Sequence, residues 1–113
     1  MVQANTTDLV FHALANPTRR KVLERLSAGP ATVSQLAESF DMQLPSFVQH
    51  LSVLERSRLV RSTKQGRVRT YEIAPERFQV VEDWLTARRK SWEARLDRFD
   101  LYVKRLKEKE SGS

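Results

Sequence analysis

Three polar side chains, Ser46, Gln49 and His50, are closely spaced in the stretch LPSFVQHLSVLE, residues 44–55. In a helix, residues three and four positions apart lie on the same face, so these side chains would form one polar surface. Such a surface could hold a metal ion, activate a serine for catalysis, or form hydrogen bonds with the edge of another molecule. Each of these chemistries needs further residues, which the rest of the sequence either supplies or lacks.

Catalysis needs more than Ser46 and His50, although these residues are four positions apart and could touch in a helix. A serine nucleophile also requires a third group that orients the base, together with an oxyanion hole. The sequence has no carboxylate at a suitable spacing and no glycine-rich elbow near the pair. We therefore expect that the protein is not an enzyme.

Metal binding is limited by the number of ligands. The chain has two histidines, His12 and His50, and no cysteine, whereas a zinc site needs three or four ligands. A dimer could double the count, but no histidine and carboxylate cluster has ligand spacing in the last part of the chain. We expect no metal site and no cofactor, and we assign His12 to the helix surface or to packing.

Positive charge is concentrated directly after the polar stretch. The chain of 113 residues has a net charge of +6, and residues 56–69 contain six basic side chains and no acidic one. They are Arg56, Arg58, Arg61, Lys64, Arg67 and Arg69. Glutamine can pair with adenine in the major groove of DNA, serine and histidine can bond base edges or phosphates, and arginines can reach the minor groove. This combination favours nucleic-acid binding over the plain alternative, an ordinary solvated helix face.

The sequence shows neither a secretion signal nor a membrane span. The first residues, MVQANTTDLVFHALANP, have no charged stretch followed by an apolar run. No window approaches the roughly 20 apolar residues that a membrane span needs. We expect a cytoplasmic protein without a membrane partner.

Four short helices are predicted in the first half of the chain. Thr6 or Thr7 caps a helix that stops by Ala15, and Asn16 followed by Pro17 starts the second. In the third, which Thr32 starts, the residues facing inward are Val33, Leu36, Ala37 and Phe40. In the fourth, the core residues are Leu44, Phe47, Val48, Leu51 and Leu54, and the opposite face carries Ser46, Gln49, His50, Val53 and Ser57.

Two β-like runs follow, LVRSTK and RVRTYEI, separated by Gln65 and Gly66. Glycine supplies the positive φ that a tight hairpin needs. This order predicts a helix-turn-helix over residues 32–57 and a wing over residues 59–74. The fold class is therefore mainly α with a small β-hairpin (α+β): a winged helix-turn-helix with a long C-terminal helix.

The last segment, which Pro75 opens, has an apolar seam with members at every seventh position: Phe78, Leu85, Trp92, Phe99 and Leu106. A domain of this size cannot cover the seam, so we expect a helix over residues 75–107 that pairs two copies into a symmetric dimer. The simpler alternative is a helix that folds back across its own domain. One domain would span residues 1–110, with a disordered tail over residues 108–113. The expected dimer interface contains Leu9, Phe11, Phe78, Leu85, Trp92, Leu96, Phe99 and Val103.

The motifs ALANPTRRKVLERL, TVSQLAESFDM, LPSFVQHLSVLERSRLV and QGRVRTYEI together resemble the ArsR (ArsR/SmtB) family of bacterial winged-helix transcriptional repressors. The resemblance covers roughly residues 8–74. It implies a homodimer that binds an inverted-repeat DNA operator, with the fourth helix in the major groove and the wing beside it. The recognition positions that it implies are Pro45, Ser46, Gln49 and His50, with Lys64, Arg67 and Arg69 in the wing, and we add Arg56 as a DNA-binding residue.

The third helix departs from the metal-sensing members of this family. Those members have a Cys-Val-Cys pair where this chain has Thr32, Val33 and Ser34. The chain therefore resembles the metal-independent branch. We expect a sequence-specific, homodimeric repressor that acts by occupying its operator and not by sensing metal. The alternative is a winged helix that binds an acidic protein partner without specific DNA binding.

Overall fold

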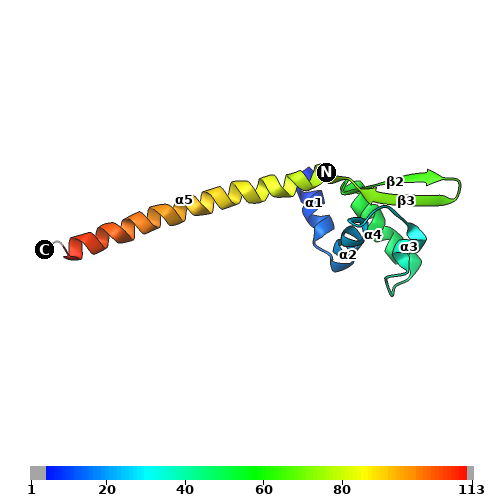
Figure 1. The fold of residues 1–113 in the computed structure, drawn as a ribbon, viewed down its shortest axis with the longest axis horizontal. Coiled ribbons are helices and arrows are strands. Elements are labelled where there is room, and N and C mark those ends of the chain that lie inside the picture. Colours follow the sequence, from blue (N-terminus) through cyan, green and yellow to red (C-terminus); the bar gives the residue numbers. More distant parts are fainter. Residues whose placement is uncertain (1–4, 112–113) are drawn as a thin grey trace. The chain divides into compact units, whose positions relative to one another are not determined.

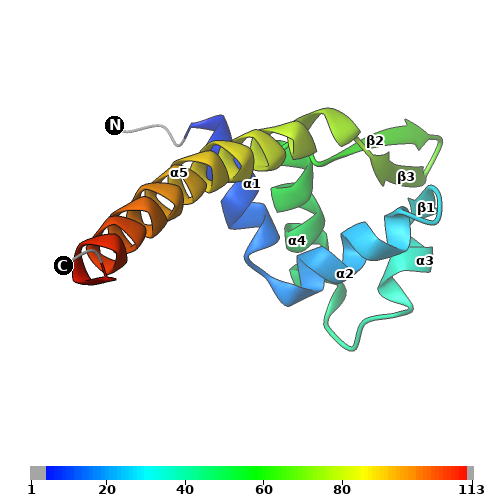
Figure 2. The same ribbon diagram turned by 60° about the vertical axis from the view of Figure 1, so that its left-hand side comes forward.

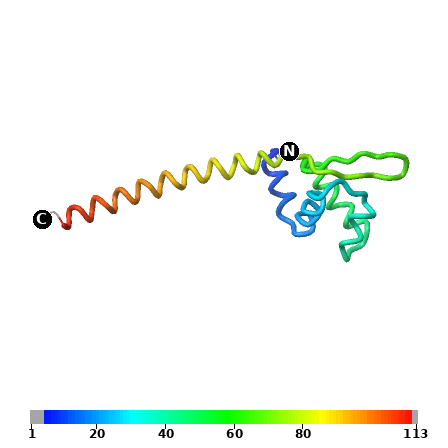
Figure 3. The backbone as a smooth tube through the Cα atoms, viewed as in Figure 1, coloured from blue at the N-terminus to red at the C-terminus, as the bar shows by residue number. Residues whose placement is uncertain are grey.

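The computed structural model describes residues 5–111, which fall into two units, residues 5–81 and 82–111. Figure 1 shows the helices and strands in chain order, and Figure 3 traces the same path as a tube. The elements are α1 (Thr6–Leu14), α2 (Pro17–Leu26), β1 (Ala31–Thr32), α3 (Val33–Ala37), α4 (Leu44–Arg56), β2 (Val60–Gln65), β3 (Val68–Ile73), the 3-10 turn η1 (Pro75–Arg77) and α5 (Phe78–Ser111). This mostly helical architecture with a small antiparallel sheet confirms the predicted winged helix-turn-helix.

Short polar side chains fix the starts of the first helices. The side chain of Asn5 accepts a hydrogen bond of 2.8 Å from the backbone N–H of Asp8, so the cap of α1 is Asn5, and the prediction of Thr6 or Thr7 was wrong. Both threonines already lie inside the helix. The prediction for α2 is confirmed, because Asn16 caps it and accepts from the Arg19 N–H at 3.1 Å. Proline at the first helical position suits this arrangement, since its missing N–H needs no partner there.

Helices α3 and α4 form the predicted helix-turn-helix. Thr32 and Gln35 form a reciprocal capping box at the start of α3, each side chain accepting from the backbone N–H of the other. Helix α3 is only 5 residues long and buries Leu36. Phe40 lies beyond its end but still packs against the core, as predicted. Helix α4 has 13 residues, and its cap residue, Gln43, makes no side-chain hydrogen bond.

The buried face of α4 is narrower than predicted. Phe47, Leu51 and Leu54 are buried as expected, but Leu44 is 55% exposed and Val48 is 39% exposed, so neither belongs to the core. Leu44 is the first residue of the helix. Both lie on the side of the buried arc that turns away from the core at 3.6 residues per turn. Residues on the other side were wrongly assigned to the solvent: Val53 packs against the core, and Ser57 is buried and donates to the Leu54 carbonyl at 2.8 Å.

Strands β2 and β3 form the predicted hairpin, with a register that runs from Val60 opposite Ile73 to Gln65 opposite Val68. The connecting loop is therefore Gly66 and Arg67, one residue later than predicted. Gly66 has a φ of +60°, whereas the φ of Arg67 is not positive. Positive φ at only the first loop position is the pattern of a type II′ turn, which matches the twist of the strands.

The sheet has a third strand that the sequence did not indicate. Residues 31–32 form β1, which pairs with β3 so that Ala31 lies opposite Tyr71, giving the strand order β1-β3-β2. Figure 2 shows β1 directly before α3 and beside the hairpin. A strand of two residues has no periodicity of its own. Its effect is to join the start of the helix-turn-helix to the wing by backbone hydrogen bonds.

The 3-10 turn η1 leads into α5, which begins at Phe78 rather than at Pro75. Phe78 and Val81 pack against the core of the first unit. The helix continues through Ser111, so residues 108–111 are helical and not part of a disordered tail. Residues 112–113 lie outside the described part of the chain, and the single domain over residues 1–110 stays a prediction. No helix among the described residues is long and apolar enough to cross a membrane.

Candidate nucleic-acid interface

The first two turns of α4 carry an exposed polar surface. Pro45, Ser46 and Gln49 are all exposed, while Phe47 between them is buried. Ser46 and Gln49 are three positions apart and therefore lie on one face of the helix. Their side chains offer a hydroxyl and an amide, which both donate and accept hydrogen bonds. The structure thus leaves two of the three polar residues predicted for recognition free to meet another molecule.

His50 is different, because one of its ring nitrogens is already in use. The Nη1 of Arg19, a residue of α2, lies 3.0 Å from Nδ1 of His50. An arginine has only donors, so Nδ1 must accept this hydrogen bond, and a neutral ring then carries its hydrogen on Nε2. His50 is half-buried. It can therefore offer DNA one donor, Nε2–H, and not two free ring nitrogens.

Burial and charge disfavour the protonated form of His50. Desolvation, followed by the positive charge of Arg19, lowers the pKa of His50 below its ordinary value. A protonated ring would have no acceptor for Arg19 and would place two cations side by side. The helical periodicity places His50 at the edge of the buried arc, three residues after Phe47 and four before Leu54, but it does not identify Arg19 as its partner.

Arg19 itself was missed by sequence reasoning. Its side chain is buried, with the residue only 8% exposed, and it also donates from Nε to the Ala13 carbonyl at 2.8 Å and from Nη2 to the His12 carbonyl at 2.9 Å. The neighbouring Arg20 donates from Nη1 to the Leu14 carbonyl at 2.7 Å. The last carbonyls of α1, which have no partner within the helix, are thus bound by two cations from α2.

The tip of the wing carries two basic side chains. Lys64 lies opposite Arg69 in the ladder, and Arg67 is in the two-residue loop. Lys64 and Arg67 are exposed, and neither side chain forms a hydrogen bond or ion pair with another described residue. Their charges are therefore available to a phosphate.

Arg69 and Arg61, in contrast, are engaged within the wing. Arg69 donates to the Ser62 hydroxyl at 2.7 Å, and Ser62 donates to Glu55 of α4 at 2.6 Å. This Arg69–Ser62–Glu55 relay connects both strands of the wing to α4. Arg61 forms an ion pair of 2.9 Å with Glu72. Of the predicted wing contacts, Arg69 would have to exchange its present bond for one to DNA.

Arg56 lies far from the other predicted DNA contacts along α4. Ten residues separate it from Ser46, which at 1.5 Å per residue is about 15 Å along the helix axis. It lines a cavity of about 210 Å³ with residues of α1 and of the turn after β3. The cavity lining consists of Thr6, Leu9, Arg56, Ser57, Arg58 and Arg77. The structure therefore groups Arg56 with a basic cluster at the opposite end of α4.

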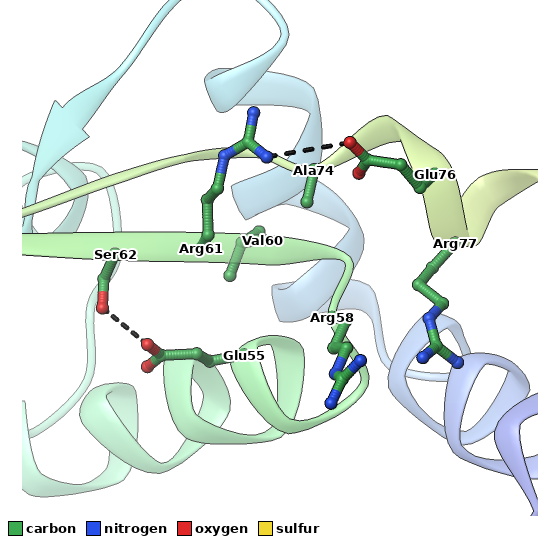
Figure 4. A pocket seen from close by; sticks show the side chains of 8 residues that line it. All are labelled: Glu55, Arg58, Val60, Arg61, Ser62, Ala74, Glu76 and Arg77. Carbon is green, nitrogen blue, oxygen red and sulfur yellow. Dashed lines mark hydrogen bonds and ion pairs between the residues drawn. The ribbon is translucent and has the colours of Figure 1, made fainter.

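A second cavity, of about 410 Å³, lies at the base of the wing, and Figure 4 shows its lining. Arg58 and Arg77 extend their guanidinium groups to the same side in this view, while Arg61 points toward Glu76. Arg58 has a φ of +62° at the end of α4. The Leu59 N–H bonds to the Leu54 carbonyl and the Arg58 N–H to the Glu55 carbonyl, which is the Schellman motif that usually has glycine at this position.

The predicted dimer residues differ in exposure. On α1, Leu9 is exposed and Phe11 is half-buried. Phe78 belongs to the core of the first unit. In the second unit, Leu85, Trp92, Leu96 and Phe99 are exposed and Val103 is half-buried. This unit, described by itself, is a helix with a large uncovered apolar surface.

The residues that the family resemblance aligns with a metal-binding motif are Thr32, Val33 and Ser34. The Thr32 hydroxyl is bound in the capping box, and Val33 packs against the core. Among the described residues, no three histidine or carboxylate side chains come together as metal ligands would. His12 is exposed on α1, in agreement with the surface role predicted for it.

Comparisons with known proteins agree with this architecture. A family model for a helix-turn-helix domain matches residues 14–63, from the end of α1 into β2. The HTH-type transcriptional regulator Rv2034 of Mycobacterium tuberculosis is 41% identical over 68 residues, which cover 60% of this chain and 64% of that protein. The transcriptional repressor SdpR of Bacillus subtilis is 32% identical over 76 residues, which cover 67% of this chain and 84% of that protein. The matched part is thus slightly less than two thirds of Rv2034.

Solved structures extend the similarity into three dimensions. The crystal structure of an ArsR family transcriptional regulator has 54% identity and a TM-score of 0.77, covering 82% of this chain and 97% of that one. The homodimeric winged helix-turn-helix DNA-binding domain of Mb0332 from Mycobacterium bovis has 27% identity and a TM-score of 0.59, covering 73% of this chain and 78% of that one. These relatives are regulators and not enzymes. The chain therefore belongs to the ArsR family of winged helix-turn-helix transcriptional regulators.

Proposed function

We propose that this protein is a homodimeric, sequence-specific DNA-binding repressor that blocks transcription by occupying an inverted-repeat operator. The observation that carries the proposal is the exposed pair Ser46 and Gln49 on the first turns of α4, together with the unpaired Lys64 and Arg67 at the wing tip. A helix in the major groove and a basic wing beside it would use both features at once. The repressor activity of SdpR supports the same direction of regulation.

The residues divide into two kinds of contact. Lys64 and Arg67 bind phosphates, which supply most of the affinity and make it depend on salt. Gln49 reads a base edge, with adenine as its best partner, and Ser46 bonds a base edge or a phosphate. His50 contributes its Nε2–H as a single donor. Arg56 belongs to this interface only if the DNA also reaches the far end of α4.

Dimerisation follows from the exposed apolar seam of α5. Leu85, Trp92 and Phe99 recur every seventh residue, and burying them against a second copy removes a large apolar surface from water. A two-fold protein matches an operator with two half-sites about 34–36 Å apart. The homodimeric state of the Mycobacterium bovis domain supports this arrangement.

The proposed repressor does not sense metal. The chain has no cysteine, and the hydroxyl of Thr32 serves as a helix cap where metal-sensing relatives have a thiolate. Regulation by metal would therefore need a ligand set that the described residues do not bring together. The protein acts in the cytoplasm, where its DNA target is.

The experiment that tests the proposal is selection of DNA duplexes from a random pool by the full chain, followed by gel shifts at two salt concentrations. We expect one inverted-repeat sequence to be enriched and its affinity to fall steeply as salt rises. A folded dimer that binds no duplex at low salt would contradict the proposal and favour a winged helix that binds an acidic protein. Enrichment of a sequence with a single half-site would contradict the dimeric operator.

A further inference from the structure

Arg19 uses three different nitrogens to connect three helices. From its place near the start of α2 it donates to two carbonyls of α1, those of His12 and Ala13, and to Nδ1 of His50 on α4. Its own backbone is held in turn, because its N–H donates to the side chain of Asn16. A guanidinium is planar, so three bonds in different directions fix its orientation.

The bond to His50 acts on the part of α4 that faces outward. His50 directly follows Gln49 and lies four residues after Ser46, so it occupies the turn that carries both exposed polar side chains. The core contacts of Phe47, Leu51 and Leu54 hold the buried face of the helix, and the bond between Glu55 and Ser62 lies near its other end. Apolar packing is non-directional, whereas a hydrogen bond requires good alignment, so the bond to His50 restricts rotation of α4 about its axis.

We infer that Arg19 is a positioning residue for DNA recognition: it ties α4 to the C-terminal end of α1 through His50, and so sets the angle at which Ser46 and Gln49 meet a base pair. This inference rests on the proposed function for its consequence. The link itself is a property of the free protein and can be measured without DNA.

The same bonds connect α4 to a surface of α1. Leu9 is exposed on α1, one turn before the carbonyls of His12 and Ala13 that Arg19 holds.

A pair of matched substitutions tests the inference. Arg19→Gln removes the guanidinium that binds His50, while Arg20→Gln removes an equal charge from the next residue, whose guanidinium donates to the Leu14 carbonyl of α1. The first readout is the ring ¹⁵N signals of His50 in the free protein. We expect a single Nε2–H form in the wild type and in Arg20→Gln, and a mixture of both forms with a higher pKa in Arg19→Gln.

The second readout is affinity for the duplex that the wild type selects, compared with random DNA. We expect Arg19→Gln to bind the selected duplex with about tenfold lower affinity, which is the equivalent of one charge-assisted hydrogen bond. On random DNA, its affinity should fall no more than that of Arg20→Gln. Equal losses by the two variants on the selected duplex would overturn the positioning role. A mixed tautomer in the free wild-type protein would overturn the link, whether or not DNA is bound.

His50 variants keep the test decisive if Arg19→Gln does not fold. Asparagine places an amide oxygen near the position of Nδ1 and can accept from Arg19, whereas leucine cannot. We expect His50→Asn to melt within a few degrees of the wild type and His50→Leu to melt several degrees lower. Identical melting of the two variants would show that the bond does not hold α4, and would overturn the inference.

Discussion

The ring of Phe40 packs against the ring of Phe47 with centroids 5.0 Å apart and planes inclined by 36°. Phe40 lies in the turn after α3 and Phe47 in the first turns of α4, so this contact spans the turn of the helix-turn-helix. We expect Phe40→Ala to lower the free energy of unfolding by about 2 kcal/mol, from lost apolar burial and the lost ring pair. Chemical denaturation measures this. Phe40→Leu, which retains most of the apolar volume, should lose less stability, and an equal loss would assign the whole effect to the ring pair and none to apolar burial.

Gln49 is expected to set base preference, and Arg67 overall affinity. Gln49→Ala should reduce discrimination at one base pair by about 1–3 kcal/mol. Arg67→Ala should weaken binding to all duplexes and reduce the salt slope by about 1. Quantitative gel shifts on the selected duplex and its single-base variants separate the two effects. A uniform loss on specific and random DNA from Gln49→Ala would remove this residue from base recognition.

Arg58 is expected to be a source of backbone strain. A residue with a Cβ atom pays about 1–2 kcal/mol to adopt the left-handed backbone conformation. Glycine avoids this steric penalty but loses more backbone conformational entropy on folding. We expect Arg58→Gly to stabilise the protein by about 1 kcal/mol in chemical denaturation. Arg58→Ala is the matched control, since it removes the guanidinium and keeps the Cβ atom, and it should give no gain. If Arg58→Ala stabilised the protein equally, the destabilisation would come from the long arginine side chain and not from the positive φ of the backbone.

Stability is expected to rise with pH near neutrality because of His50. Its pKa is lowered by desolvation and by Arg19, so the unfolded chain binds a proton at this site more readily than the folded chain does. The contribution of neutral His50 to folding stability is fully present above the ordinary histidine pKa of about 6.5. It is lost as the pH falls from there through the lowered pKa of the folded state. Denaturation curves at several pH values should show this loss in the wild type. His50→Asn, which does not titrate, should lack it, and a similar loss in both proteins would assign the effect to other groups.

Dimerisation is expected to depend on one side of α5. Trp92→Glu places a charge on the apolar seam, and we expect it to shift the protein from dimer to monomer in sedimentation experiments. Ala94→Glu adds the same charge about 200° away around the helix, at 100° per residue, and should leave the dimer intact. Dissociation by Ala94→Glu alone would place the interface on the opposite side of the helix.

The sequence was most informative where a local chemical rule applies. Asparagine before proline starts α2, threonine with a glutamine three residues later starts α3, and a glycine marks the hairpin. Each signal is contained within a few residues. Asn5 was overlooked as the cap of α1 because two threonines directly after it are also good capping residues.

The remaining errors have a tertiary origin. Strand β1 exists because β3 offers it a partner, and no property of two residues alone predicts that pairing. His50 reads as a surface residue until Arg19, 31 positions earlier, is placed beside it. Arg56 was grouped with the wing by its position in the sequence, whereas α4 carries it away from the wing tip. Contacts between distant residues decided each of these cases.

The hairpin also fixes how far its basic tip extends. Each strand has six residues in continuous register, which at about 3.3 Å per residue gives a length of about 20 Å. The Arg69–Ser62–Glu55 relay prevents the base of the hairpin from moving independently of α4. Lengthening each strand by two residues would carry Lys64 and Arg67 about 7 Å outward. This distance is about the rise of two base pairs of DNA. In the proposed DNA complex, the number of strand residues would therefore set how far the wing tip reaches along the duplex.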